Sequence, residues 1–113
     1  MKEFALLFRQ PSFDRSKMAP EQIEATAKKW AEWSEGIAVQ GKISAPGNKL
    51  VPQGKVLRSG GVITDGPFVE IREMLGGFVI VKVENEEEAI TLAHGCPVLE
   101  NGGSVEIRPV NRN

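Results

Sequence analysis

The residues best suited to chemistry in this 113-residue sequence gather around one corner, Asp65-Gly66-Pro67-Phe68. Pro67 fixes its own φ angle and lacks a backbone donor, and it biases the residue before it towards extended conformations. We expect this stiff corner to aim the Asp65 carboxylate into a cleft beside Phe68, where it could bind a ligand or act as a general acid or base. The alternative is structural, because an aspartate can cap such a turn while Phe68 anchors the corner in the core.

Three further charged residues follow the corner and are candidate ligand-binding residues: Glu70, Arg72 and Glu73. On a strand, Glu70 and Arg72 share one face. A second carboxylate beside Asp65 would raise the pKa of one of the two groups, because like charges repel. The alternative is a solvated strand edge, where each surface ion pair contributes under about 1 kcal/mol.

The single histidine, His94, and the single cysteine, Cys96, lie close together near the end of a predicted helix. The helix dipole favours a cation at His94, and acid–base catalysis is the other role open to it. Cys96 precedes a proline and has no adjacent base, so we interpret it as a small buried residue and not as a nucleophile. No zinc-ligand spacing and no phosphate-binding loop are present, so the sequence predicts no metal and no organic cofactor.

The elements that must position these residues follow from periodicity and from helix and turn signals. We expect a long irregular loop over residues 41–54, with a short strand near 49–51. Gly60-Gly61 indicates a hairpin. The predicted strands cover residues 2–9, 55–59, 62–64, 78–84 and 104–108, and the predicted helices cover residues 20–39 and 85–94. The order predicts a single α+β domain over residues 1–113, with the ferredoxin-like βαββαβ arrangement of two helices on one face of an antiparallel sheet.

Composition excludes several classes of function. The chain has 14 Lys and Arg against 15 Asp and Glu, and this balance argues against direct nucleic-acid binding. No apolar run approaches the roughly 20 residues that a membrane-spanning helix needs. A single cysteine suits a reducing compartment, so we expect a soluble cytoplasmic protein.

Two predicted strands, residues 2–9 and 78–84, are apolar on both faces, although two helices can cover only one face of the sheet. A large uncovered apolar face is rare on soluble monomers, so we expect a homodimer through the sheet faces. The alternative is that the loop over residues 41–54 folds over this face. On the long helix, an apolar stripe should pack on the sheet, with both tryptophans in the core and not forming a stacking platform. The stripe comprises Ile23, Ala27, Trp30, Ser34 and Ile37, with Trp33 beside it.

In its central motif and its ending the chain resembles YCII-related proteins of the DGPF-domain branch. The branch often has lysine at the position of Arg72, which keeps the charge but changes the donor geometry. The resemblance runs from the first strand to Pro109. The residues that carry it are Asp65-Gly66-Pro67-Phe68, Glu70, Arg72, Glu73, Gly76-Gly77-Phe78, Gly95-Cys96-Pro97 and Gly102-Gly103-Ser104-Val105-Glu106-Ile107-Arg108-Pro109.

This resemblance implies a ferredoxin-like domain that dimerises through its sheet faces, as in dimeric α/β-barrel proteins. Most members have no established activity. Some are encoded beside, or fused to, extracytoplasmic-function sigma factors, which implies a link to sigma-factor regulation. A better-known branch carries a proposed His–Asp active site. Asp65 matches the DGPF aspartate, whereas the first helix of this chain has no histidine and His94 lies elsewhere.

Two functions therefore follow as hypotheses. The first is a ligand-binding or regulatory dimer that binds a small molecule near Asp65-Gly66-Pro67-Phe68. The alternative is a cofactor-independent isomerase, lyase or dehalogenase with Asp65 as general acid or base, and with His94 as a second catalytic candidate. The sequence favours the first function, because no nucleophile–base pair is visible.

Overall fold

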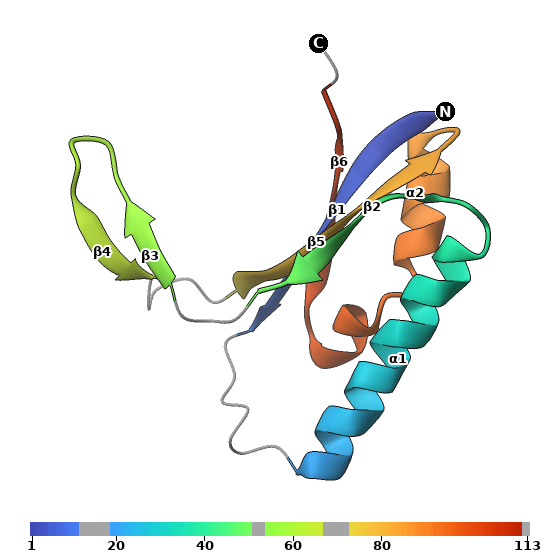
Figure 1. The fold of residues 1–113 in the computed structure, drawn as a ribbon, viewed down its shortest axis with the longest axis horizontal. Coiled ribbons are helices and arrows are strands. Elements are labelled where there is room, and N and C mark those ends of the chain that lie inside the picture. Colours follow the sequence, from blue (N-terminus) through green and yellow to red (C-terminus); the bar gives the residue numbers. More distant parts are fainter. Residues whose placement is uncertain (12–18, 51–53, 67–72, 112–113) are drawn as a thin grey trace.

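A four-stranded antiparallel sheet with two helices on one side forms the body of the protein (Figure 1). The structure is a computed structural model that describes residues 1–11, 19–50, 54–66 and 73–111. The strand order is β2-β5-β1-β6. The elements of this body are β1 (Lys2–Pro11), α1 (Pro20–Ala38), β2 (Ile43–Lys49), β5 (Glu73–Val83), α2 (Glu86–Ala93) and β6 (Ser104–Pro109). This arrangement confirms the predicted ferredoxin-like α+β fold.

A hairpin interrupts this order between β2 and β5. Its strands, β3 (Gly54–Leu57) and β4 (Ile63–Gly66), pair with each other and form a separate two-stranded sheet. Figure 1 shows the hairpin extending away from the main sheet. The Gly60-Gly61 signal predicted this turn correctly, and both glycines have positive φ angles there.

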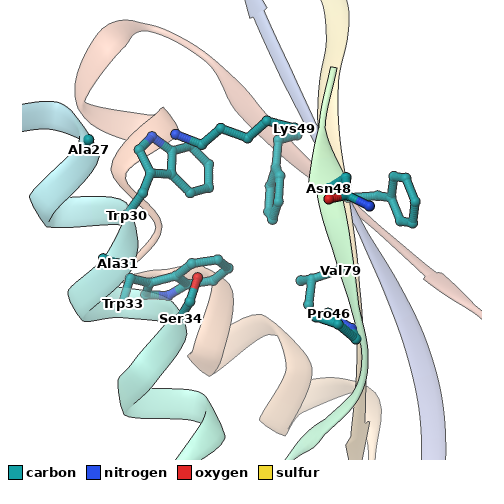
Figure 2. A pocket seen from close by; sticks show the side chains of 11 residues that line it. Ala27, Trp30, Ala31, Trp33, Ser34, Pro46, Asn48, Lys49 and Val79 are labelled. Carbon is teal, nitrogen blue, oxygen red and sulfur yellow. The ribbon is translucent and has the colours of Figure 1, made fainter. Parts of the chain in front are cut away.

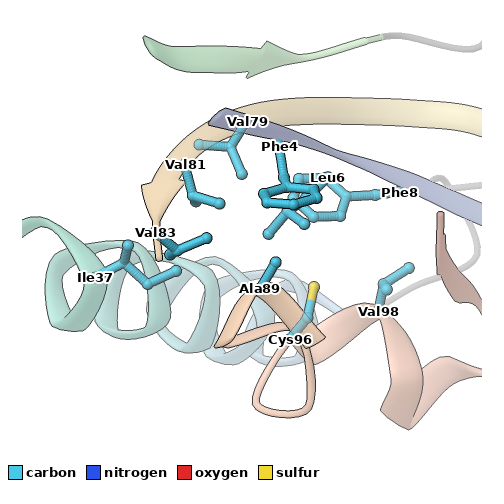
Figure 3. Close-up of a cluster of buried hydrophobic side chains, with 10 residues drawn as sticks. All are labelled: Phe4, Leu6, Phe8, Ile37, Val79, Val81, Val83, Ala89, Cys96 and Val98. Carbon is cyan, nitrogen blue, oxygen red and sulfur yellow. The ribbon is translucent and has the colours of Figure 1, made fainter. Parts of the chain in front are cut away.

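The core lies between the sheet and the helices (Figure 3). Because side chains alternate along a strand, β1 and β5 each direct every second residue towards the helices. In the register of the sheet, Leu6 lies opposite Val79 and Phe4 lies opposite Val81. The buried cluster comprises Phe4, Leu6, Phe8, Ile37, Val79, Val81, Val83, Ala89, Cys96 and Val98.

The first helix packs less closely on the sheet than its sequence predicts. Pro20 lies in its first turn, as expected, but Ile37 is its only buried residue within the described part of the chain. Ala27 and Ser34 are exposed, whereas Trp30 and Trp33 are partly buried against the core. The predicted stripe therefore packs at Ile37 and at the two tryptophans, whereas the prediction is wrong at Ala27 and Ser34. The two indoles are much larger than the alanine and serine side chains beside them, so they reach the core and the shorter side chains stay exposed.

The prediction of an irregular loop over residues 41–54 is also wrong, because β2 occupies Ile43–Lys49 and forms an edge of the main sheet. Pro46 and Gly47 lie within this strand, and the register with β5 shifts between Ile43 and Ala45 and again between Ala45 and Asn48. An edge strand tolerates proline because one of its sides needs no backbone donor. These two residues favoured a loop in the sequence, and they produce an irregular strand in the structure.

The second helix begins as predicted, and Asn85 is its N-cap. The Asn85 side chain accepts a hydrogen bond from the Glu88 backbone N–H, at 2.9 Å. The Glu88 carboxylate accepts from the Glu84 backbone N–H, at 3.2 Å, in place of the reciprocal bond to Asn85 that a capping box would make. A short 3₁₀ helix, Pro97–Asn101, follows α2 and was not predicted.

Candidate ligand-binding cleft

An open cleft of about 280 Å³ lies between α1 and the β2 edge of the sheet (Figure 2). One wall comes from α1, the other from β2 and β5, and Phe8 of β1 contributes between them. The lining residues are Phe8, Ala27, Trp30, Ala31, Trp33, Ser34, Pro46, Asn48, Lys49, Phe78 and Val79.

Three aromatic rings form a fixed part of this lining. The ring centroids of Phe8 and Trp30 lie 4.9 Å apart, those of Phe8 and Trp33 lie 5.6 Å apart, and those of the two indoles lie 5.8 Å apart. All three pairs meet edge to face, which is a favourable geometry for aromatic rings. The Trp33 indole N–H also donates to the Leu92 carbonyl at 3.0 Å, which links α1 to α2 and holds this ring in place.

Trp30 differs from Trp33 in its polar edge. Among the residues that the structure describes, none accepts a hydrogen bond from the Trp30 indole N–H. The Lys49 ammonium lies 4.8 Å from the centroid of the Trp30 ring, within the range of a cation–π interaction. Figure 2 shows the Lys49 side chain reaching across the cleft towards this ring. An ammonium group and an indole N–H therefore lie at one rim of an aromatic-walled cleft.

Short side chains on α1 leave the space that the cleft occupies. Ala27, Ala31 and Ser34 lie four and three residues apart, so they share the helix face that carries Trp30. A longer side chain at these positions would extend into the space between α1 and β2. The spacing of alanine and tryptophan on one helix face is the sequence signal that could have indicated the cleft.

The described lining of the cleft contains few ionisable groups. Lys49 is the only charged residue among its described lining residues, and no carboxylate, imidazole or thiol belongs to that lining. Within the described part of the chain, no three His, Cys, Asp or Glu residues gather in a way that could hold a metal ion.

The predicted site residues around Asp65 lie mostly outside the described part of the chain. Asp65 lies near the end of β4, with its Cα paired with that of Lys55, and its side chain lies outside the described part. Glu73 begins β5, with its Cα paired with that of Pro11, and its side chain is likewise not described. Phe68, Glu70 and Arg72 lie outside the described residues, so their predicted roles stay predictions.

His94 and Cys96 have contrasting surroundings. His94 is exposed at the C-cap of α2, and its backbone N–H donates to the Ile90 carbonyl at 3.1 Å. Cys96 is buried in the core, as predicted. Burial raises the pKa of the Cys96 thiol to about 11, because the thiolate would lose its hydration. At neutral pH this group is therefore a thiol, which is a poor nucleophile.

The fold and the cleft define a small ferredoxin-like α+β domain with one open, aromatic-walled hollow beside its first helix. The family model of the YCII-related domain matches residues 6–112. This chain belongs to the YCII-related domain family, as its sequence resemblance predicted. A search of curated proteins finds no match. No helix in the described part of the chain has the length and apolar character that crossing a membrane requires.

Proposed function

We propose that this protein binds a small molecule in the cleft between α1 and β2, in a ligand-binding or regulatory role. The observation that carries this proposal is the rigid aromatic wall of Phe8, Trp30 and Trp33, which faces an open hollow with a cation at its rim. Ligand sites typically combine apolar and aromatic walls with a few polar groups in this way.

The two tryptophans of the chain provide the readout for this function, because they give only two indole N–H signals in an NMR spectrum. We expect 2-naphthol, a neutral aromatic probe, to shift both signals saturably. Ala31→Leu should weaken this binding at least about tenfold, since the added side chain occupies the space beside the indoles.

Ala25→Leu is the matched control, because Ala25 is exposed on the same helix and does not line the cleft. This variant should bind the probe as the wild type does. If 2-naphthol leaves both indole signals unchanged, or if the two leucine variants bind it equally well, the proposed site is wrong.

We further propose that the protein acts as a homodimer joined through its open sheet face. Leu7 lies opposite Phe78, and Ala5 lies opposite Ile80, on the side of the sheet away from the helices. All four are only partly buried, and this is the kind of apolar face that a second copy would cover. A cytoplasmic location and a link to sigma-factor regulation stay predictions from the sequence and from the resemblance.

The alternative function is a cofactor-independent isomerase, lyase or dehalogenase that uses Asp65 as general acid or base. This alternative is supported by the register of the hairpin, which pairs the acidic residue Asp65 of β4 with the basic residue Lys55 of β3. Asp65→Asn keeps the shape of the residue and removes its charge. If the protein is an enzyme, we expect this variant to keep its melting temperature and lose turnover. If Asp65 only caps a turn, Asp65→Asn should be nearly neutral in stability and in ligand binding. In that case Asp65→Ala should lower the free energy of unfolding by about 0.5–2 kcal/mol, by analogy with helix caps.

A further inference from the structure

We infer that the ligand of the cleft is a flat aromatic carboxylate of one or two rings, with its carboxylate at Lys49 and Trp30. This inference rests on the proposed function and adds the chemical class of the ligand. It follows from three features of the cleft: the shape of its walls, the charge at its rim and its volume.

The walls favour a flat apolar body. Trp30 and Trp33 stand nearly perpendicular to each other, at 86°, and each ring meets Phe8 edge to face. A planar ring that enters the space between α1 and β2 can stack on one indole while it meets the other edge-on, and both geometries are favourable. Pro46 and Val79 line the cleft on the side of the sheet and add further apolar surface.

The rim favours a negative charge. Lys49 supplies the only charge among the described lining residues, and its ammonium lies 4.8 Å from the centre of the Trp30 ring. The Trp30 indole N–H is part of that ring and points to no acceptor among the described residues. A carboxylate has two oxygens, so it can accept from both groups at once. Lys49 also interacts elsewhere in the chain, but an ammonium has three N–H donors.

The volume limits the size of the ligand. A cleft of about 280 Å³ lies at the small end of ligand sites, which typically have about 300–1,000 Å³. One or two fused rings with a carboxylate fit this space. A nucleotide or an acyl chain of ordinary length would extend far beyond it.

Three probes with the same ring system, similar size and different charge test the inference: 2-naphthoate, 2-naphthamide and 2-naphthylmethylammonium. We expect the anion to bind roughly five- to tenfold more tightly than the amide at low salt, since a charge-assisted hydrogen bond is stronger than a neutral one. The cation should bind least. The Trp30 indole signal should move more than the Trp33 signal, because the Trp33 N–H already donates to Leu92.

Two substitutions assign the preference to its donors. Lys49→Gln should make the anion and the amide bind with equal affinity. Trp30→Phe should weaken binding of the anion more than binding of the amide, because phenylalanine keeps a ring and lacks the N–H. Lys28→Gln is the control. Lys28 is 78% exposed on α1 and does not line the cleft. Its substitution by glutamine removes one positive charge, as Lys49→Gln does.

The outcomes separate the two proposals. Equal binding of all three probes to the wild type would overturn the ligand class and leave the binding function standing. An anion preference that survives Lys49→Gln, or that disappears equally in Lys28→Gln, would overturn the role of Lys49. Failure of all three probes to bind would overturn both the ligand class and the binding function.

Discussion

At the scale of single residues, the close approach of β2 to β5 shapes one wall of the cleft. Gly47 has a φ angle of +63° in the middle of β2, in the region that L side chains rarely adopt. A Cβ at this position would overlap the carbonyl oxygen of Phe78 and lie 2.7 Å from its carbonyl carbon. Gly47 therefore combines a conformational requirement with a steric one.

Gly47→Ala should destabilise the protein by about 3 kcal/mol or more, because both the φ angle and the backbone contact must change. Gly41→Ala is the control, since Gly41 has a similar φ angle of +70° with open space around it. The control should lose only about 1 kcal/mol. Urea unfolding of both variants measures the difference, and equal losses would contradict the steric argument.

Cys96 gives a prediction that depends on pH. Burial raises the pKa of its thiol from the ordinary value of 9.0 to about 11. Between these two values the unfolded chain releases the Cys96 proton and the folded chain keeps it. Ionisation therefore favours the unfolded state, and the free energy of unfolding falls as pH rises through this window.

We expect wild type to lose unfolding free energy relative to Cys96→Ala as pH rises from 9 towards 11. Both proteins share every other titrating group, so the difference isolates the thiol. The measurement is chemical unfolding under reducing conditions at several pH values. If the free energy of unfolding depends on pH in the same way in both proteins, the thiol already ionises freely in the folded state and the prediction is wrong. Rapid stoichiometric labelling of native Cys96 by a thiol reagent would also contradict its burial.

At the scale of elements, Glu88 connects α2 to the residue that precedes β2. Its carboxylate forms an ion pair with the Lys42 ammonium at 2.7 Å and accepts from the Glu84 backbone N–H. The Lys42 side chain lowers the pKa of Glu88 below its ordinary value of 4.5, and the bond from Glu84 adds to this effect. The stabilisation is therefore present above pH 4.5 and is lost as pH falls through the lowered pKa.

Glu88→Gln should reduce the free energy of unfolding at pH 7 by more than at pH 3. Glu87→Gln is the matched control, because Glu87 lies in the same first turn of α2 and shares its effect on the helix dipole. Thermal unfolding of the three proteins at both pH values gives the comparison. A loss that is equal at the two pH values would mean that the Lys42 ion pair contributes nothing measurable.

The elements also show where sequence patterns stop being informative. The strong signals predicted β1, both helices and the hairpin, because strand alternation, helical spacing and Gly60-Gly61 act locally. β2 was not predicted, because Pro46 and Gly47 break a strand pattern locally while the neighbouring β5 supplies its hydrogen-bond partners. A local sequence pattern does not show which distant strand will pair with a segment, so it could not predict this edge strand.

The cleft was missed for a similar reason. Trp30 and Trp33 fall on the apolar stripe of α1, and this position predicted two core residues. They do pack against the core, but they also line a hollow, because the distance between α1 and β2 depends on residues far apart in the sequence. The candidate set around Asp65 came from an unusual motif, and most of its side chains lie outside the described residues.

At the scale of the whole molecule, both helices lie on one face of the sheet (Figure 1), and the opposite face is the open sheet face proposed above as an interface. The helices cover Phe4, Leu6 and Phe8, whereas Leu7 and Ile80 on the opposite side are only partly buried. Charged residues on β6 border this open face: Arg9 of β1 pairs with Glu106 at 3.1 Å, and Arg108 lies opposite Ala5. An apolar centre with a charged rim is typical of protein interfaces.

For the proposed homodimer, we expect Leu7→Glu to yield a monomer, because the proposed interface would have to bury the new carboxylate. Light scattering on a sizing column at micromolar concentration gives the mass of each species. Val39→Glu is the control, since Val39 is 77% exposed at the C-cap of α1, a helix that lies on the other side of the sheet (Figure 1). The control should stay dimeric with an unchanged melting temperature. A wild-type protein with the mass of one chain, or a Leu7→Glu variant that remains a folded dimer, would show that the open sheet face does not join two copies.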